Sequence, residues 1–299
     1  MSDADLQRFR ESFNPPAWLA NHAEVTARDI HLVYALKPGQ VYCTSPKRFA
    51  VKITDASGEE ASIYDKLLRL GPASPNHVLP CTVVWSDTQH PFVIMPCLTD
   101  LTNAGLGKWN STSCARIFGQ MVEAVEMLHR QKIAHMDIAV NNFVMAKAHH
   151  MPHHDCIELG KIYIIDFGVS HHFELGPGRQ SSIKLPPTQV PKPQGITHLD
   201  PFSWDIYCLG FTFQTLLGWV YRDRPQPWML RRYATWLLGN EQGCTAVCHC
   251  RPGAREALWV ITFIGWILDA AGVSSKVLDL AWNGSASVFG SRALRPGPP

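Results

Sequence analysis

The sequence predicts an α+β protein with a small β-rich N-terminal part and a larger, mainly helical C-terminal part. Three observations support this. Apolar runs with alternation or β-branched residues occupy 30–53, where the turn signals KPGQ and SPKR separate them, and recur at 77–85 and 91–98. One helical pattern, at 59–70, lies among these strands and ends at Gly-Pro. Two longer helical patterns, at 111–131 and 200–220, dominate the rest.

These patterns divide the chain of 299 residues, which is long enough for two lobes. We expect an N-terminal extension over 1–27, the β-rich part over 28–98 and the helical part over 99–283. The tail 284–299 is rich in Gly, Ser and Pro, which predicts disorder. The apolar run LWVITFIGWIL at 258–268 is too short to span a bilayer, so we interpret it as a buried helix or strand.

The composition limits the partners and the compartment. The net charge is +2 and only 17% of the residues are charged, so nothing favours a nucleic acid or a membrane surface as partner. Nine cysteines without a regular spacing, and a polar, acidic beginning unlike a signal peptide, indicate a reducing environment. We therefore expect an intracellular, cytoplasmic protein.

Five polar residues stand in contexts that suggest a common site. Lys52 lies inside the apolar strand FAVKI, and Glu60 lies on the helix that follows. Asp137 and Asn142 belong to HMDIAVNNF, directly after the first long helix, and Asp166 ends the apolar run KIYIID. A carboxylate at the end of a buried strand is unfavourable unless a cation pairs with it. We expect these five side chains to converge on one cleft.

The order and spacing of these motifs resemble the eukaryotic protein kinase family. AVKI resembles that family's strand-three lysine motif, HMDIAVNN its catalytic loop, DFG its metal-binding triplet, and DPFSWDIYCLG the helix that anchors its large lobe. The resemblance covers roughly residues 30–220. It implies a bilobal kinase-like fold, in which the β-rich part is the N-lobe and the helical part is the C-lobe.

The resemblance also implies roles for the five residues, with ATP and Mg²⁺ as the ligands. Lys52 would hold the α- and β-phosphates of ATP, and Glu60 would orient Lys52 by an ion pair. Asp166 would bind magnesium, and Asn142 would supply an oxygen to a second magnesium. Asp137 would accept the proton of the attacking hydroxyl or orient that hydroxyl.

Further positions are assigned by the same resemblance to the adenine pocket. Met95 would line its back. The carbonyl of Pro96 and the amide of Leu98 would meet the adenine edge. Ala50 and Val144 would sandwich the adenine ring.

Two structural features are also implied by the resemblance. An apolar column would link the lobes, made of Tyr64, His135 and Phe167. Asp205 would be a buried carboxylate that accepts hydrogen bonds from amides of the catalytic loop.

The sequence departs from the family pattern in its functional loops. Only Gly39 stands where the family has a glycine-rich loop over the phosphates. Met136 replaces the arginine that pairs with a phosphorylated activation segment. Ala139 and Asn141 match neither the serine/threonine nor the tyrosine kinase pattern.

The distal part is also atypical. Pro186, Pro187 and Thr188 replace the family's Ala-Pro-Glu, so Arg251 would lack its glutamate partner. Because an unpaired buried charge is unfavourable, we expect a loosely packed lobe or an exposed Arg251. The chain between 220 and 251 is short for the usual helices.

Some motifs allow a second interpretation. Ser57 and Glu60 also fit a helix capping box, in which case Glu59 could serve Lys52 instead. A run of metal-ligand residue types lies in an apparent insertion, where a polar loop is the default interpretation: His149, His150, His153, His154 and Cys156. A second run, around Cys244 and Cys248, lacks the second ligand pair of a zinc finger.

We therefore interpret the chain as a protein kinase that transfers the γ-phosphoryl group of ATP to a protein hydroxyl, serine or threonine rather than tyrosine. Two alternatives stay open. The chain could be a weak or inactive pseudokinase that acts as a binding module, as the missing glycine loop suggests. It could also be a small-molecule kinase on the same fold. The sequence identifies neither the protein substrate nor the oligomeric state.

Overall fold

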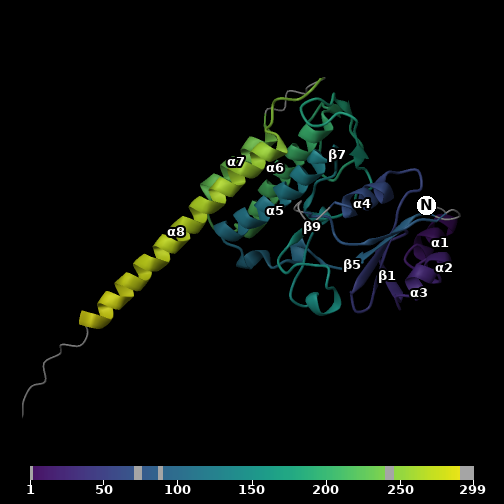
Figure 1. Ribbon diagram of the computed structural model, residues 1–299, viewed down its shortest axis with the longest axis horizontal. Coiled ribbons are helices and arrows are strands. Elements are labelled where there is room, and N and C mark those ends of the chain that lie inside the picture. The colour runs from purple at the N-terminus through teal and green to yellow at the C-terminus, as the bar shows by residue number, and fades with distance from the viewer. Residues whose placement is uncertain (1–2, 71–75, 87–89, 240–245, 290–299) are drawn as a thin grey trace, which may run out of the picture.

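The computed structural model describes residues 3–70, 76–86, 90–239 and 246–289, and has the predicted α+β architecture (Figure 1). The N-lobe contains a five-stranded antiparallel sheet in the order β1-β2-β3-β5-β4 and one helix, α4. Its elements are β1 (Leu32–Lys37), β2 (Val41–Thr44), β3 (Phe49–Ile53), α4 (Glu60–Leu68), β4 (Thr82–Val84) and β5 (Phe92–Pro96).

The central strand β3 gives the sheet its two faces. Successive side chains of a strand point to opposite faces, so Ala50 and Lys52 share one face and Val51 lies on the other. Lys52 pairs with Val41 of β2 and with Val93 of β5. Both neighbouring strands therefore hold the backbone of the lysine in register.

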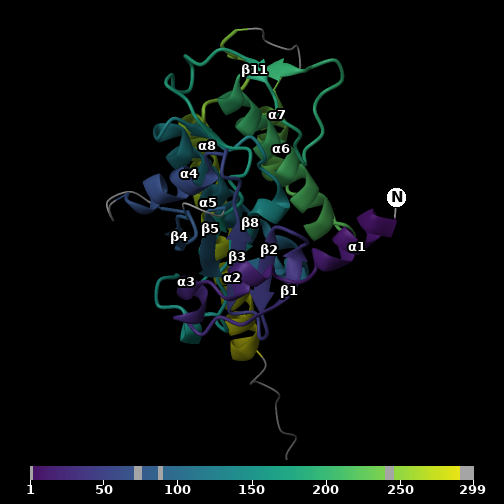
Figure 2. The same cartoon turned by 90° about the vertical axis from the view of Figure 1, so that its right-hand side faces the viewer.

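The N-terminal extension forms three short helices, α1 (Asp3–Glu11), α2 (Ala17–Ala20) and α3 (Ala23–Thr26). Helices α2 and α3 lie beside this sheet, whereas α1 extends away from it (Figure 2). Leu19 and Val25 are fully buried against its outer face, and the ring of Trp18 contacts that of Phe92 with centroids 6.2 Å apart. This small second core consists of Leu19, Val25, Ile30, Tyr42, Val51, Val84, Phe92 and Ile94. Helices α2 and α3 of the extension therefore pack as part of the N-lobe.

The C-lobe is built on four helices, α5 (Ser111–Arg130), α6 (Pro201–Val220), α7 (Trp228–Leu238) and α8 (Ala254–Phe289), and the small sheet β6-β8-β9. The strands of that sheet are β6 (Thr99–Asp100), β8 (Phe143–Met145) and β9 (Ile162–Ile164). Short elements complete the lobe: η1 (Leu101–Asn103), η2 (Leu106–Lys108), β7 (Ile133–Ala134), η3 (Val140–Asn142), η4 (Met151–His153), β10 (His171–His172), β11 (Ile183–Lys184) and β12 (His198–Leu199).

The amphipathic helix α5 lies at the centre of the main core. The rings of Phe118 on α5 and Phe213 on α6 stack with centroids 4.0 Å apart. The same continuous cluster of buried apolar side chains includes Tyr64 of α4 and Ile261 of α8. One core therefore joins the two lobes and fixes the cleft between them.

The predicted burial of 258–268 is only half right. The segment is helical, as part of α8, and buries Ile261 and Ile264. The opposite side is exposed, with Trp259 at 70% and Trp266 at 69% of their surface accessible. A uniformly apolar run does not reveal that only one of its faces meets the core.

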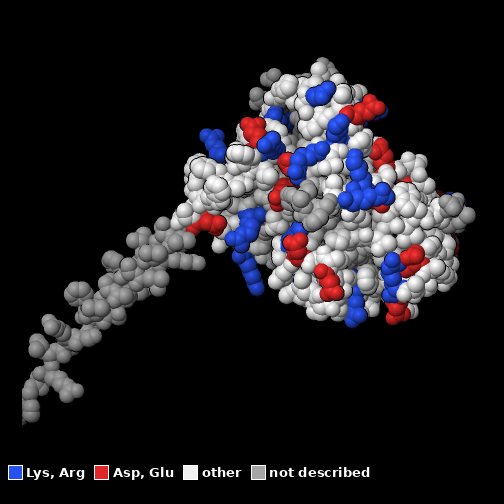
Figure 3. All heavy atoms as spheres, viewed as in Figure 1, with Lys and Arg blue, Asp and Glu red and all other residues white. Residues whose placement is uncertain are grey.

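Helix α8 projects from the body of the molecule (Figure 1) and reaches Phe289, so the first residues of the tail that we expected to be disordered are helical. The rest of that tail, 290–299, lies outside the described residues. None of the described helices has both the length and the apolar character that crossing a membrane requires. On the face shown in Figure 3, basic and acidic side chains are interspersed.

The prediction of an exposed Arg251 is wrong. Its exposed fraction is 8%, and its Nε donates to the carbonyl of Leu238 at 2.7 Å. Its Nη1 donates to Ser203 Oγ at 3.3 Å, and the guanidinium lies over the Tyr207 ring, 5.1 Å from the centroid. A carbonyl, a hydroxyl and an aromatic face thus stand in for the missing carboxylate. Its buried Nη2 has no hydrogen-bond partner among the described atoms.

Replacing Leu19 tests whether the extension stabilises the N-lobe. Because Leu19 is fully buried between α2 and the sheet, we expect Leu19→Ala to lower the free energy of unfolding by about 2–5 kcal/mol. Leu6→Ala, on the partly exposed α1, is the matched control and should change it by less than about 0.5 kcal/mol. Denaturant unfolding of the full chain measures both. Equal effects of the two substitutions would contradict the assignment.

Candidate functional site

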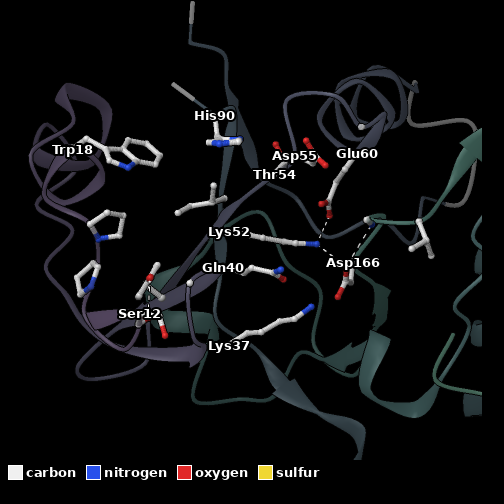
Figure 4. Close-up of a pocket in the computed structure, with 18 of the residues that line it drawn as sticks. Ser12, Trp18, Lys37, Gln40, Lys52, Thr54, Asp55, Glu60, His90 and Asp166 are labelled. Atoms are coloured by element: carbon white, nitrogen blue, oxygen red, sulfur yellow. Dashed lines mark hydrogen bonds and ion pairs between the residues drawn. The ribbon is translucent and has the colours of Figure 1, made fainter. Parts of the chain in front are cut away.

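The ammonium of Lys52 is shared by two carboxylates from different lobes (Figure 4). Its Nζ lies 2.5 Å from Oε1 of Glu60 on α4 and 2.6 Å from Oδ1 of Asp166, which follows β9. Lys52 and Glu60 are almost fully buried, with exposed fractions of 6% and 4%. Residues 114 positions apart in the chain are thus joined at one point.

The alternative interpretation of Glu60 as part of a capping box is not realised. Helix α4 begins at Glu60 itself, and its N-cap residue Glu59 makes no side-chain cap bond. The backbone N–H of Ser57 donates to Asp55 instead, at 2.9 Å. Glu59 does not serve Lys52: its carboxylate accepts from His171 Nδ1 at 2.8 Å, which ties α4 to β10.

The three charged groups influence one another strongly because burial reduces their contact with water. Burial alone would lower the pKa of the Lys52 amine, but the carboxylates of Glu60 and Asp166 outweigh burial and raise that pKa. Burial raises the pKa of the Glu60 carboxyl, although Lys52 opposes it. For Asp166 burial acts in the same direction, but Lys52 prevails and lowers the pKa. Lys52 is therefore a stable cation, and Asp166 is the more readily ionised of the two acids.

The column of rings predicted between the lobes is present. Phe167, directly after Asp166, contacts the ring of Tyr64 edge-on at 4.8 Å and that of His135 at 5.2 Å between centroids. The N–H of Phe167 donates to Oε1 of Glu60 at 3.1 Å, the oxygen that also holds Lys52. The position of α4 thus depends on that of the segment after β9.

The loop after β7 is organised by Asp205, which is fully buried on α6. Its carboxylate accepts the N–H groups of His135 at 2.8 Å and Met136 at 2.7 Å, and His129 Nε2 lies 3.0 Å away. Met136 has a φ of 63°, in the left-handed region that a side chain disfavours. The two charge-assisted bonds hold this strained backbone, and so they place Asp137.

Asp137 and Asn142 contact each other at the mouth of this loop. The amide Nδ2 of Asn142 donates to the carbonyl of Asp137 at 2.7 Å and to its Oδ2 at 3.2 Å. Asn142 is 3% exposed, and its donated amide leaves the side-chain oxygen as the atom that could bind a metal.

Gln189 is a site residue that the sequence did not indicate. Its backbone N–H donates to Oδ1 of Asp137 at 2.6 Å, and its Nε2 donates to Oδ2 at 2.9 Å. The side-chain amide of Asn141 in turn donates to the side-chain oxygen of Gln189 at 3.3 Å. No local motif signals the contact between Gln189 and Asp137, because 52 residues separate its partners.

A cavity of about 1080 Å³ collects four of the five predicted side chains, whereas Asn142 is absent from its lining. Lys52, Glu60, Asp137 and Asp166 all line it. Its opposite wall was not predicted and comes from the N-terminal extension, the β1–β2 turn and the loop before β5: Glu11, Ser12, Asn14, Pro15, Pro16, Trp18, Lys37, Gly39, Gln40 and His90.

This cavity does not reach the residues expected around adenine. Ala50, Met95 and Val144 are absent from its lining and have exposed fractions of 6%, 6% and 7%. Pro96, the last residue of β5, is buried, and Leu98, two residues later, is half-buried. The open space therefore lies at the end of the cleft where phosphates would sit.

The donor set at this end suits magnesium. The side chain of Asp166 is 32% exposed and faces the cavity, and carboxylate and amide oxygens are the ligands that this cation prefers. In the part of the chain that the structure describes, no three His, Cys, Asp or Glu side chains are arranged to hold a metal. Two protein ligands suffice where phosphate and water complete the shell. Cys244, from the second cysteine run, lies outside the described residues.

Removing Asp205 tests how the loop is held. Asp205→Ala leaves two buried N–H groups without an acceptor, so we expect the free energy of unfolding to fall by about 3 kcal/mol or more. Asp155→Ala, an exposed acid on the insertion, should have little effect. Chemical denaturation compares the two. Similar losses would contradict the organising role of Asp205.

A comparison with protein families agrees with this geometry. The family described as the protein kinase domain matches residues 39–217, more than half of the chain. The match spans the cation of β3, the loop after β7, the segment after β9 and most of the anchoring helix α6. No curated protein matches the chain. The chain therefore belongs to the protein kinase domain family.

Proposed function

We propose that the protein is a MgATP-dependent kinase that transfers the γ-phosphoryl group to a serine or threonine hydroxyl of a protein. The observation that carries the proposal is the shared position of the Lys52 ammonium between Glu60 and Asp166, in a cavity that Asp137 also lines. Phosphoryl transfer needs this combination, since the protein mainly positions and neutralises charged oxygens.

Each side chain then has one task. Lys52, held by Glu60, contacts the α- and β-phosphates as a point charge. Asp166 and the side-chain oxygen of Asn142 hold Mg²⁺, which neutralises charge on the transferred group when bound. Asp137 orients the attacking hydroxyl and accepts its proton.

The adenine end supports the proposal less directly. Adenine binding by Ala50, Val144, Met95, Pro96 and Leu98 requires Ala50 and Val144 to separate, because both are more than nine-tenths buried. Small movements between lobes commonly accompany ligand binding.

The closed adenine end also favours a second candidate function, that of a pseudokinase acting as a binding module. In that case the Lys52–Glu60–Asp166 arrangement would serve the fold rather than catalysis. The MgATP titration described next separates the kinase from the binding module.

Titration of MgATP into the full chain, followed by the thermal midpoint, tests the enzyme function. Binding stabilises the folded state by mass action, about 2.7 kcal/mol at a hundredfold excess over Kd, so the midpoint should rise by several degrees. Asp166→Ala should abolish the magnesium-dependent part of the rise, whereas Asp29→Ala, at an exposed acid, should keep it. A wild-type midpoint unmoved by millimolar MgATP would favour the binding module.

Catalysis needs its own measurement. Phosphate transfer onto a generic protein acceptor should fall at least a hundredfold in Asp137→Ala, while the MgATP-dependent thermal shift stays, because Asp137 acts on the hydroxyl. Loss of binding together with transfer would show that Asp137 has a structural role.

Gln189 should act as a positioning residue for Asp137. In Gln189→Ala the bond from Nε2 to Asp137 is lost and the backbone bond stays, so we expect kcat to fall about tenfold with KM for ATP unchanged. Gln180→Ala, in the same segment but bonded to the carbonyl of Ser181, is the matched control. An increase in kcat for Gln189→Ala would instead mean that Gln189 obstructs the acceptor.

A further inference from the structure

The β1–β2 turn offers no free backbone amide to a phosphate. Pro38 has no N–H group. The N–H of Gly39 donates to the carbonyl of Ser12 at 2.9 Å, and that of Gln40 donates to the carbonyl of Lys37 at 3.0 Å. Each of the three turn residues between β1 and β2 thus either lacks a backbone N–H group or already donates it to a carbonyl. In a glycine-rich loop, such amides would be the groups that approach the phosphates.

The N-terminal extension holds the turn in this state. The carbonyl of Ser12 accepts both the N–H of Gly39 and the hydroxyl of Tyr42, the latter at 3.0 Å. Gly39 has a φ of 76°, and its missing Cβ would lie 3.8 Å from Ser12. The extension therefore occupies the donor that a nucleotide would need, and the turn cannot bind phosphate through its backbone while this contact persists.

A side-chain cation stands at the same place. Lys37, the last residue of β1, lines the cavity and points toward Asp166 (Figure 4). Among the described residues no carboxylate lies within 4.0 Å of its ammonium. The ammonium of Lys37 therefore faces the cavity without pairing with a carboxylate of the described residues.

The charge balance of the cavity favours an additional cation at the position of Lys37. Lys52 carries one positive charge against the two carboxylates of Glu60 and Asp166, both within hydrogen-bonding distance. An incoming polyphosphate meets a group of three side chains whose sum is negative when both acids are ionised. A further cation on the N-lobe side offsets this repulsion, in addition to the Mg²⁺ that enters with the polyphosphate.

We propose that the Lys37 ammonium binds the polyphosphate of the nucleotide from the N-lobe side, in place of the backbone amides of a glycine-rich loop. Lysine suits this task, because its flexible stem and compact charge contact phosphate oxygens without a preformed geometry. The proposal rests on the proposed function for its nucleotide, but the anion site itself needs only a polyphosphate.

Inorganic tripolyphosphate with Mg²⁺ tests the anion site without the adenine pocket. Its affinity for the full chain is measured by calorimetry for wild type, Lys37→Ala, Lys37→Arg and the control Lys47→Ala. Lys47 is another exposed lysine, near β2 and outside the cavity, so it matches the change in net charge. We expect Lys37→Ala to weaken binding about ten- to a hundredfold, Lys37→Arg to restore most of it, and Lys47→Ala to leave it within twofold.

The outcomes separate this inference from the proposed function. Equal affinities of wild type and Lys37→Ala, equal losses in Lys37→Ala and Lys47→Ala, or no wild-type binding of tripolyphosphate would each overturn the inference. MgATP binding and transfer by the wild type decide the proposed function separately. Tripolyphosphate binding that depends on Lys37, in a chain that does not bind MgATP, would support the anion site and reject the kinase.

Discussion

The site depends on a single buried ammonium with two carboxylates around it. Removal of either acid would leave Lys52 with less compensation in a poorly hydrated place, and removal of Lys52 would leave two acids facing each other. Since Glu60 comes from α4 and Asp166 follows β9, the charge constraint is also a constraint on how the lobes meet. The ring contacts of Phe167 reinforce the same alignment through packing.

A second buried carboxylate controls the other half of the cleft. Asp205 is fully buried and fixes two consecutive amides of the loop, one of them in the unfavourable left-handed region at Met136. Strain of this kind persists only where the surroundings determine the conformation. Because Asp137 directly follows Met136, the hydrogen bonds of Asp205 on α6 also determine the position of Asp137.

The sequence allowed the prediction of those residues whose neighbours in the chain form motifs. Lys52, Asp137 and Asp166 each lie in a recognisable local context, and the structure brings them to one cavity. Gln189 and the Ser12 contact could not be predicted, because each joins segments far apart and follows no spacing rule. Two predictions were wrong for a related reason: the full burial of 258–268, which rested on apolar content, and the exposure of Arg251, which rested on the missing glutamate at Thr188. Composition does not say which helix face is covered, and a motif does not exclude carbonyl and aromatic partners.

The absent glycine loop and the added N-terminal extension are parts of one arrangement. A flexible, glycine-rich turn can place amides against phosphate only if nothing else binds them. Here the extension binds the Gly39 amide through Ser12, and in doing so it builds the far wall of the cavity. The turn loses freedom, which lowers the entropy that ligand binding would otherwise have to remove. Recognition of an anion then has to come from a side chain that reaches past the turn, and Lys37 at the end of β1 is in the position to do so.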